Sequence, residues 1–220
     1  MSTTQRLLTA TQDIWAQYHT HPFVQGIADG SLDADKFKYY IIQDYLYLDE
    51  YLKVFALGIA KSHSIDTLSI FSHSVAALTE EEMNIHRGYL HTFNVSREAL
   101  NATPRALDNL SYTSYMLRVA YEDSEAEIVA AVLSCAYSYE VIAREIVRNH
   151  PQAEQHELFG EWVRGYASDE YAAGNKPLME AMDQLTEHYT EQQLQHVEDI
   201  FVACSRYELA FWDMAWNMRK

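Results

Sequence analysis

The chain has 220 residues, 48% of them hydrophobic, which suits one large domain with a single core better than two small ones. Its formal net charge of −16 at pH 7 argues against a nucleic-acid partner, because binding to a phosphate backbone requires clustered Lys and Arg. Since the only cysteines are Cys135 and Cys204, the sequence encodes neither a disulfide framework nor a paired-cysteine metal site.

Segments with helical periodicity follow one another along the chain, separated by a few glycines and prolines, and this pattern predicts an all-α protein. The first helix is predicted from Thr3 to Thr20, ending before Pro22, because the residue ahead of a proline disfavours helical geometry. A short segment follows this first helix. After Gly30, Ser31 is expected to cap a long helix that reaches about Ser62.

The remaining helices are predicted to form, with these two, one bundle over residues 1–220, since no repeat or linker interrupts the pattern. No apolar run reaches the roughly 18 residues of a membrane span, and Met1 to Ala10 lacks the features of a secretory signal. We therefore expect a soluble cytoplasmic protein that makes no membrane contact. The predicted ranges are Ile65 to Phe93, Tyr112 to Tyr121, Ser124 to Asn149, Glu154 to Ala172, Pro177 to Tyr189 and Thr190 to Met218.

Asp44 interrupts the apolar stripe of the second long helix. Apolar residues recur around it at spacings of three and four, including Tyr40, Tyr47 and Tyr51, so this face is predicted to turn to the core. A buried carboxylate needs partners. Asp44 is therefore interpreted either as a structural residue bonded to tyrosine hydroxyls or as a ligand-binding residue.

Cys135 lies in a similar apolar stripe on the helix from Ser124 to Asn149, with Tyr139 one turn further on. A buried cysteine is usually an inert apolar residue. The neighbouring tyrosine, which could share a pocket with the sulfur, favours a reactive thiol. Cys204, in the last helix, is interpreted as core.

Glu208 occupies the centre of the apolar face of the last helix, at a position where periodicity favours leucine. Burial would raise its pKa towards neutrality, which suits a carboxyl group that must both give and take a proton. A salt bridge to Arg206, Arg144 or Arg118 is the alternative interpretation. One thiol, two carboxyls and several phenols are thus expected in the interior of one bundle.

Segments spread over almost the whole chain match the pattern of one known family. They are His21 to Gly26, Phe37 to Tyr40 with Gln43 and Asp44, Tyr112 to Met116, Cys135 with Tyr139 and Glu140, Tyr166 to Glu170, and Tyr207 and Glu208 with Phe211 and Trp212. In these segments the sequence resembles the thiaminase II (TenA) family, which implies a haem-oxygenase-like helical fold. The implied reaction is hydrolysis of 4-amino-5-aminomethyl-2-methylpyrimidine, or of thiamine, to 4-amino-5-hydroxymethyl-2-methylpyrimidine in thiamine salvage. The resemblance also implies a homotetramer and no cofactor.

By position in the family pattern, Cys135 resembles the nucleophile, Glu208 the general acid and base, and Tyr47 the residue that helps to activate the thiol. The resemblance implies that Cys135 adds to the pyrimidine ring, so that one difficult step becomes two easier ones. The implied substrate-binding residues are Asp44, Tyr139, Tyr166, Tyr112, Phe23 and Phe211.

Two enzyme alternatives and one binding alternative are compatible with a helical bundle. A haem protein would need an axial histidine, for which His19 or His21 is a candidate. A di-metal oxidase would use pairs such as Glu82 and His86, but the paired Glu-x-x-His motifs are missing, and Glu80 to Glu82 are interpreted as a solvated face. A non-catalytic pyrimidine-binding or regulatory module is the third alternative.

Overall fold

The computed structural model describes the backbone of residues 1–220 and every side chain except that of Glu81. Over this part of the chain the structure contains helices and no strand, which confirms the all-α prediction. The elements are α1 (Thr3–Thr20), α2 (Pro22–Asp29), α3 (Ala34–Lys61), α4 (Ile65–Ala77), the π-helical turn η1 (Leu78–Glu82), α5 (Met83–Thr92), α6 (Arg97–Ala102), α7 (Leu107–Glu122), α8 (Glu125–Asn149), the 3-10 turn η2 (Pro151–Gln155), α9 (Gly160–Ala167), α10 (Asp169–Leu185) and α11 (Glu191–Asn217).

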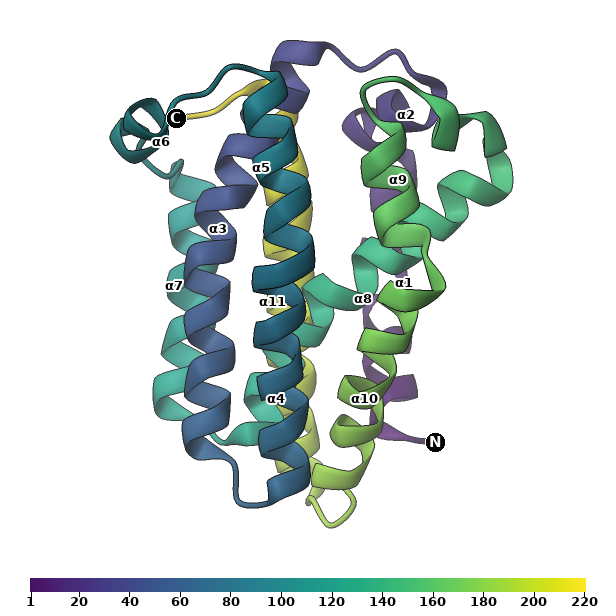
Figure 1. Ribbon diagram of the computed structural model, residues 1–220. Coiled ribbons are helices and arrows are strands. Elements are labelled where there is room, and N and C mark those ends of the chain that lie inside the picture. Colours follow the sequence, from purple (N-terminus) through teal and green to yellow (C-terminus); the bar gives the residue numbers. More distant parts are fainter.

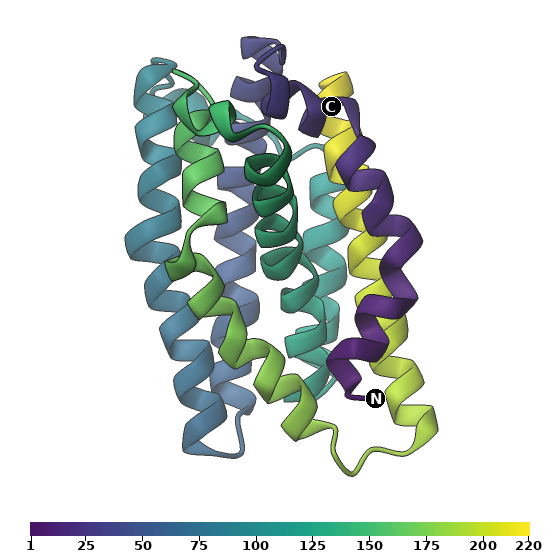
Figure 2. The same ribbon diagram turned by 90° about the vertical axis from the view of Figure 1, so that its right-hand side faces the viewer.

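The long helices stand side by side as an upright bundle, in which α3 and α7 form one side and α1, α9 and α10 the other (Figure 1). Helix α8 lies between the two sides and contacts α3, α7, α9, α10 and α11. Turned by 90°, the structure shows α9 and α10 as one bent path along the face of the bundle (Figure 2). The interior is therefore built around α8, the helix that carries Cys135.

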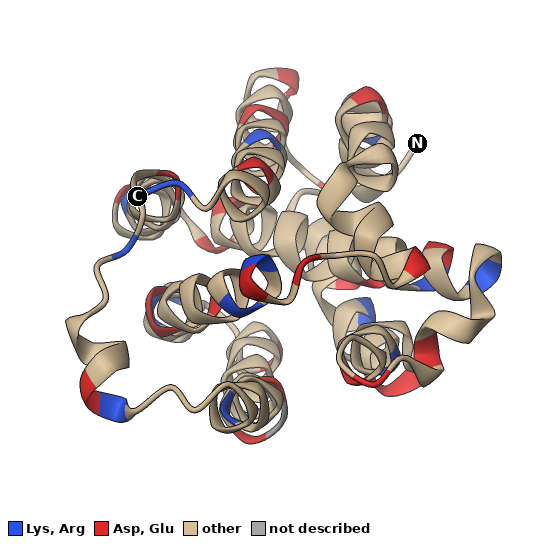
Figure 3. Ribbon diagram, turned by 90° about the horizontal axis from the view of Figure 1, so that it is seen from above, with Lys and Arg blue, Asp and Glu red and all other residues tan. Residues whose placement is uncertain are grey.

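Helix α8 is long and apolar enough, by length and composition alone, to cross a membrane. In the structure 78% of its most apolar window is buried inside the bundle, as in the core helix of a water-soluble protein. Charged residues gather on the outward parts of the helices in the view from above (Figure 3). The apolar character of α8 thus reflects its central place in the bundle.

The N-terminal boundary of α3 differs from the sequence prediction. Ser31 does not cap the helix; its backbone N–H donates to Asp29 Oδ1 at 2.9 Å, which keeps it in the preceding turn. Asp33 is the cap, and its Oδ1 accepts a hydrogen bond from the backbone N–H of Asp35 at 2.8 Å. Ser31 and Asp33 are both favourable N-cap residues and lie close together in the sequence. The prediction of Ser31 was wrong because the preceding turn, in which Ser31 is bonded to Asp29, makes Asp33 the cap.

The division between α9 and α10 was also misplaced. The predicted break at Pro177 is wrong, because Pro177 lies inside α10. The break falls at Ser168, whose hydroxyl accepts a hydrogen bond from the backbone N–H of Tyr171 at 3.0 Å and so caps α10. Helix α6 was not predicted, and α7 begins at Leu107, ahead of the predicted Tyr112.

Candidate active site

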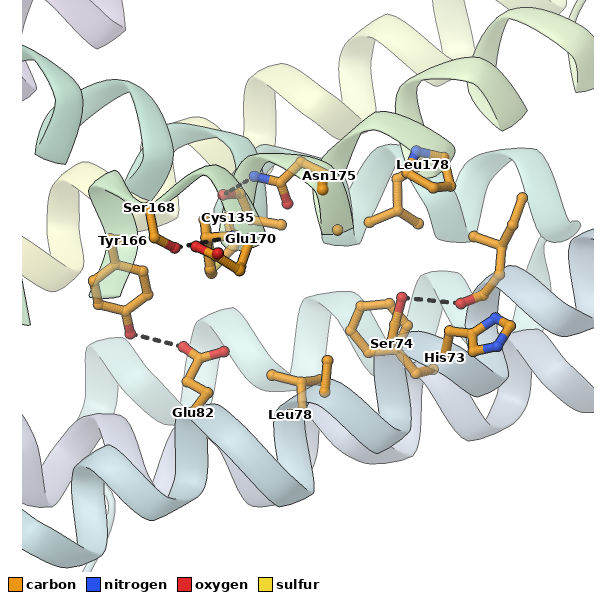
Figure 4. Close-up of a pocket in the computed structure, with 18 of the residues that line it drawn as sticks. His73, Ser74, Leu78, Glu82, Cys135, Tyr166, Ser168, Glu170, Asn175 and Leu178 are labelled. Carbon is orange, nitrogen blue, oxygen red and sulfur yellow. Dashed lines mark hydrogen bonds between the residues drawn. The ribbon is translucent and has the colours of Figure 1, made fainter. Parts of the chain in front are cut away.

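A cavity of about 500 Å³ lies between α4 and η1 on one side and α9 and α10 on the other (Figure 4). Its inner end is formed by buried side chains of α3 and α8, among them Tyr51, Phe55 and Cys135. Its outer end is lined by exposed residues, including His73 of α4 and Gly174 of α10. The cavity therefore connects the surface to the Cys135 sulfur.

Two of the predicted site residues, Cys135 and Tyr166, line this cavity directly. Glu208 is buried behind Cys135 and lies close enough for its carboxyl group and the thiol to act on each other's pKa. The structure thus brings the predicted nucleophile and the predicted acid–base residue into one region. They come from α8 and α11, helices that pack along each other.

Burial raises the pKa of the Cys135 thiol well above its usual value, and the nearby carboxylate of Glu208 raises it further. The Tyr47 hydroxyl acts in the opposite direction, because it can donate to the thiolate. Burial also raises the pKa of Tyr47, so its hydroxyl keeps its proton as a donor. Cys135 is accordingly a thiol at neutral pH and needs a base to become a nucleophile.

Burial, together with the charge of Asp44, raises the pKa of Glu208 to about 8. The side chains of Tyr112, Tyr139 and Cys135 partly oppose this by stabilising the carboxylate. Glu208 forms no salt bridge within the described residues. At neutral pH this carboxyl group can therefore either donate or accept a proton.

The alternative salt-bridge interpretation of Glu208 is wrong. Arg118 pairs with Glu122 at 2.8 Å, and Arg144 pairs with Glu140 at 3.3 Å and with Asp169 at 2.9 Å. Arg206, the third candidate, is exposed.

Asp44 is part of a buried hydrogen-bonded chain. Its Oδ2 lies 2.7 Å from Nε2 of His86 and accepts from the Tyr40 hydroxyl at 3.1 Å. The Tyr40 hydroxyl also lies 3.2 Å from the hydroxyl of Tyr139 and accepts from Trp162 Nε1 at 3.1 Å. The predicted hydrogen bond from a tyrosine hydroxyl to Asp44 is therefore present, and the chain of hydrogen bonds links Asp44 to Tyr139.

His86 makes the shorter of the two hydrogen bonds to Asp44. Its Nδ1 lies 2.9 Å from the backbone carbonyl of Glu82, so both ring nitrogens face acceptors. Burial alone would lower the pKa of His86, but the Asp44 carboxylate outweighs burial and raises it. Both printed hydrogen bonds of the Asp44 side chain involve Oδ2, and Oδ1 accepts no hydrogen bond from the described part of the chain.

The remaining predicted residues pack around this network and do not line the cavity. Tyr47 stacks on Tyr51 with 5.2 Å between ring centroids and packs edge-on against Phe211 at 5.7 Å. Phe23 lies further back, 5.6 Å from the ring of Trp212. The buried hydroxyl of Tyr112 has no hydrogen-bond partner among the described residues, although it lies close enough to Glu208 to affect its pKa.

Glu82 is a cavity residue that sequence reasoning missed. Its Oε1 accepts a hydrogen bond from the Tyr166 hydroxyl at 2.7 Å, and burial raises its pKa to about 7 (Figure 4). The prediction of a solvated face holds for Glu80, is wrong for Glu82, and cannot be applied to the Glu81 side chain, which lies outside the described residues. The π-helical turn η1 shifts the helical register at Glu82. A prediction that assumes a constant period of 3.6 residues therefore does not identify Glu82 as an inward-facing residue.

The haem-protein and di-metal-oxidase alternatives can be compared with the surroundings of their candidate ligands in the structure. Within the described residues no group of three or more His, Cys, Asp and Glu side chains is placed to hold a metal ion. His21 accepts from the backbone N–H of Phe23 at Nδ1, and its Nε2 lies 3.3 Å from Asp213, so neither ring nitrogen is free for haem. His19 lies at the shallow groove between α1 and α8, away from the Cys135 cavity.

Comparison with known proteins gives consistent matches. The sequence model of the TENA/THI-4/PQQC family matches residues 8–218. An aminopyrimidine aminohydrolase from Helicobacter pylori is 41% identical over 217 residues, covering 99% of this chain and 100% of that protein.

Two solved structures are similar in fold. One, from a Silicibacter strain and described as a TenA family transcription regulator, has a TM-score of 0.90 at 26% identity and covers 97% of this chain and 96% of its own. A Shewanella denitrificans domain with a heme oxygenase-like fold has a TM-score of 0.71 at 14% identity, covering 97% and 90% of the two chains. The second match concerns the fold alone, and it agrees with the predicted fold class.

Proposed function

The chain belongs to the TENA/THI-4/PQQC family, and from that membership we propose that it is an aminopyrimidine aminohydrolase of thiamine salvage. It replaces the amine of 4-amino-5-aminomethyl-2-methylpyrimidine by a hydroxyl group derived from water. The observation that carries the proposal is a buried thiol at the inner end of a cavity open to the surface, with a protonatable carboxyl group buried close behind it.

In the proposed reaction Cys135 is the nucleophile and Glu208 moves the protons. The Glu208 carboxylate takes the thiol proton, and the sulfur adds to the ring carbon next to the one that bears the exocyclic carbon. Ring aromaticity is lost, the exocyclic C–N bond breaks, and its electron pair leaves with the amine, which receives the proton from Glu208.

The second half of the reaction reverses these transfers. Water adds to the exocyclic carbon and gives a proton to Glu208, and the sulfur then leaves the ring, which becomes aromatic again. The thiol recovers its proton from Glu208, so that the net change is amine plus water to alcohol plus ammonia. A pKa near 8 suits this repeated exchange, because both protonation states of Glu208 are populated near neutral pH.

The same proposal assigns ring binding to the network around Asp44. Its oxygen Oδ1 can accept from the amidine-like edge of the ring, while His86 holds the carboxylate in place through Oδ2. Tyr139 and Tyr166, with ring centroids 4.8 Å apart, offer aromatic surface, and Tyr112, Phe23 and Phe211 support it from behind. The Tyr47 hydroxyl, which donates to Met116 Sδ at 3.6 Å in this structure, can donate to the thiolate instead and so help Cys135 to ionise.

We also propose that the protein is a cytoplasmic homotetramer that needs no cofactor and binds neither nucleic acid nor membranes. The high negative charge supports the absence of a nucleic-acid partner. Sedimentation equilibrium of the purified protein measures the assembly, and a mass of one or two chains would contradict the tetramer.

The function is tested by incubating the purified protein with the aminomethylpyrimidine and, separately, with thiamine. We expect the hydroxymethyl product from both, with equimolar ammonia from the first, and kcat/KM for the two identifies the preferred substrate. Thermal stabilisation by these pyrimidines without product formation would instead support a non-catalytic binding module.

A further inference from the structure

A π-helical turn places Glu82 in the cavity, in the part that also contains Cys135. Glu82 is the last residue of η1, a π-helical turn between α4 and α5. Such turns are rare and recur at functional sites, where the extra residue redirects a side chain. Here the Glu82 side chain turns into the same cavity as the Cys135 thiol.

The two carboxylate oxygens of Glu82 have different surroundings. Oε1 accepts the Tyr166 hydroxyl at 2.7 Å, whereas Oε2 accepts no hydrogen bond from the described part of the chain. Figure 4 shows the carboxyl group between Tyr166 and the open part of the cavity, on the side opposite Cys135. One oxygen is thus fixed by the protein and the other faces the space that a ligand would occupy.

The charges along the cavity favour a cationic ligand. Glu82 and Glu170 are the acidic residues of its described lining, His73 lies at the exposed outer end, and neither Lys nor Arg belongs to that lining. A phosphorylated pyrimidine would meet carboxylates without a positive partner, which is unfavourable. An ammonium group next to Glu82 would gain a charge-assisted hydrogen bond.

We propose that Glu82 recognises the positively charged amino substituent of the substrate and makes the site prefer unphosphorylated, amine-bearing pyrimidines over their neutral hydroxymethyl products. This inference rests on the proposed function and adds the basis of substrate choice. When Cys135 attacks the ring, the exocyclic substituent of the same ring can extend towards the opposite wall, where Glu82 lies.

Binding of the substrate amine as an ammonium also changes the proton balance of the reaction. An amine that binds as ammonium leaves as ammonia without a further proton, because the electron pair of the broken C–N bond goes to a nitrogen that retains three hydrogens. The proton that Glu208 took from Cys135 can then join the released ammonia. Glu208 is free to accept the proton of the incoming water.

The test compares the Glu82→Gln variant with a matched Glu170→Gln variant in the full-length protein. Glu170 lines the same cavity but is exposed, so its substitution removes an equal charge without the Glu82 contact. We expect Glu82→Gln to raise KM for the aminomethylpyrimidine roughly 10- to 100-fold, the usual effect of losing a hydrogen bond to a charged group. Inhibition by the neutral hydroxymethyl product should be unchanged, and Glu170→Gln should raise KM for the aminomethylpyrimidine far less than Glu82→Gln does.

Equal weakening of the amine and of the hydroxymethyl compound in Glu82→Gln would overturn the inference, since it would indicate a role in packing. An unchanged KM would overturn it as well. The same preference can be measured without turnover, by calorimetric binding of both compounds to Cys135→Ser protein with and without Glu82→Gln. A failure of the proposed reaction would therefore be distinguished from a failure of the recognition by Glu82.

Discussion

At the scale of single residues, Cys135 and Glu208 share one buried site, and each disfavours ionisation of its neighbour. Only one negative charge is readily accommodated there, so the pair holds a proton that can be exchanged between sulfur and oxygen. Cys204 is also fully buried, and burial likewise raises its pKa, but it lies outside the cavity. The two cysteines thus differ in surroundings: the proposed nucleophile lines a cavity, whereas Cys204 is packed in the core.

Glu208 should make the stability of the protein depend on pH. Its pKa is raised from 4.5 to about 8 in the folded state, so the folded protein binds the extra proton between these values. The free energy of unfolding therefore decreases as pH rises from 4.5 to about 8, by an amount on the order of several kcal/mol. Glu208→Gln should remove this component, as measured by urea denaturation at pH 5 and pH 8.5, with Glu170→Gln as the control. Identical pH dependence in Glu208→Gln and in the wild type would contradict the raised pKa.

Three residues of the candidate site could be predicted from the sequence, because each lies within the apolar stripe of a helix. Asp44, Cys135 and Glu208 could be identified because a helix of constant period puts each of them among buried neighbours. Glu82 could not, because it follows a local change of period in an acidic run that is typical of a solvated face. His86 could be considered only as a metal ligand, since its partner Asp44 is distant in sequence.

At the scale of elements, the close approach of α3 and α4 depends on Gly58. A Cβ atom at this position would come within 2.8 Å of the Phe71 ring, which is fully buried. A Cβ atom at Gly88, in α5, would have no neighbour within 4 Å. The two glycines are both helical but meet different surroundings.

Alanine substitution at the two glycines should therefore have opposite effects. Gly58→Ala should lower the free energy of unfolding by about 1–3 kcal/mol through overpacking. Gly88→Ala should raise it by about 0.5–1 kcal/mol, because alanine is the better helix former. Denaturant titrations of both variants measure this. Stabilisation of equal size in both would show that α4 can move away from α3 at little cost.

Element boundaries were predicted with mixed success for physical reasons. Helix α1 and the ends of α8 were predicted correctly, since their caps and terminating residues are unambiguous in sequence. The start of α3 and the junction of α9 and α10 were not, because the choice between Ser31 and Asp33 and the break at Ser168 depend on tertiary contacts. The short α6 has too few residues to show a period.

At the scale of the whole molecule, the site exists only because distant segments converge around α8. Asp44 comes from α3, Cys135 and Tyr139 from α8, Tyr166 from α9 and Glu208 from α11. Composition and periodicity predict a helical bundle with polar groups inside, but they do not specify which groups meet. That step came from the resemblance to a family, and the contacts in the structure are compatible with it.

The most direct test of the central claim is the steady-state hydrolysis of 4-amino-5-aminomethyl-2-methylpyrimidine by Cys135→Ser, Glu208→Gln and Cys204→Ser proteins of verified helical content. The account predicts a loss in kcat of at least about 10³-fold for Cys135→Ser and of about 10²- to 10⁴-fold for Glu208→Gln. It predicts wild-type turnover with reduced stability for Cys204→Ser. Near wild-type turnover in Cys135→Ser or Glu208→Gln would contradict the account.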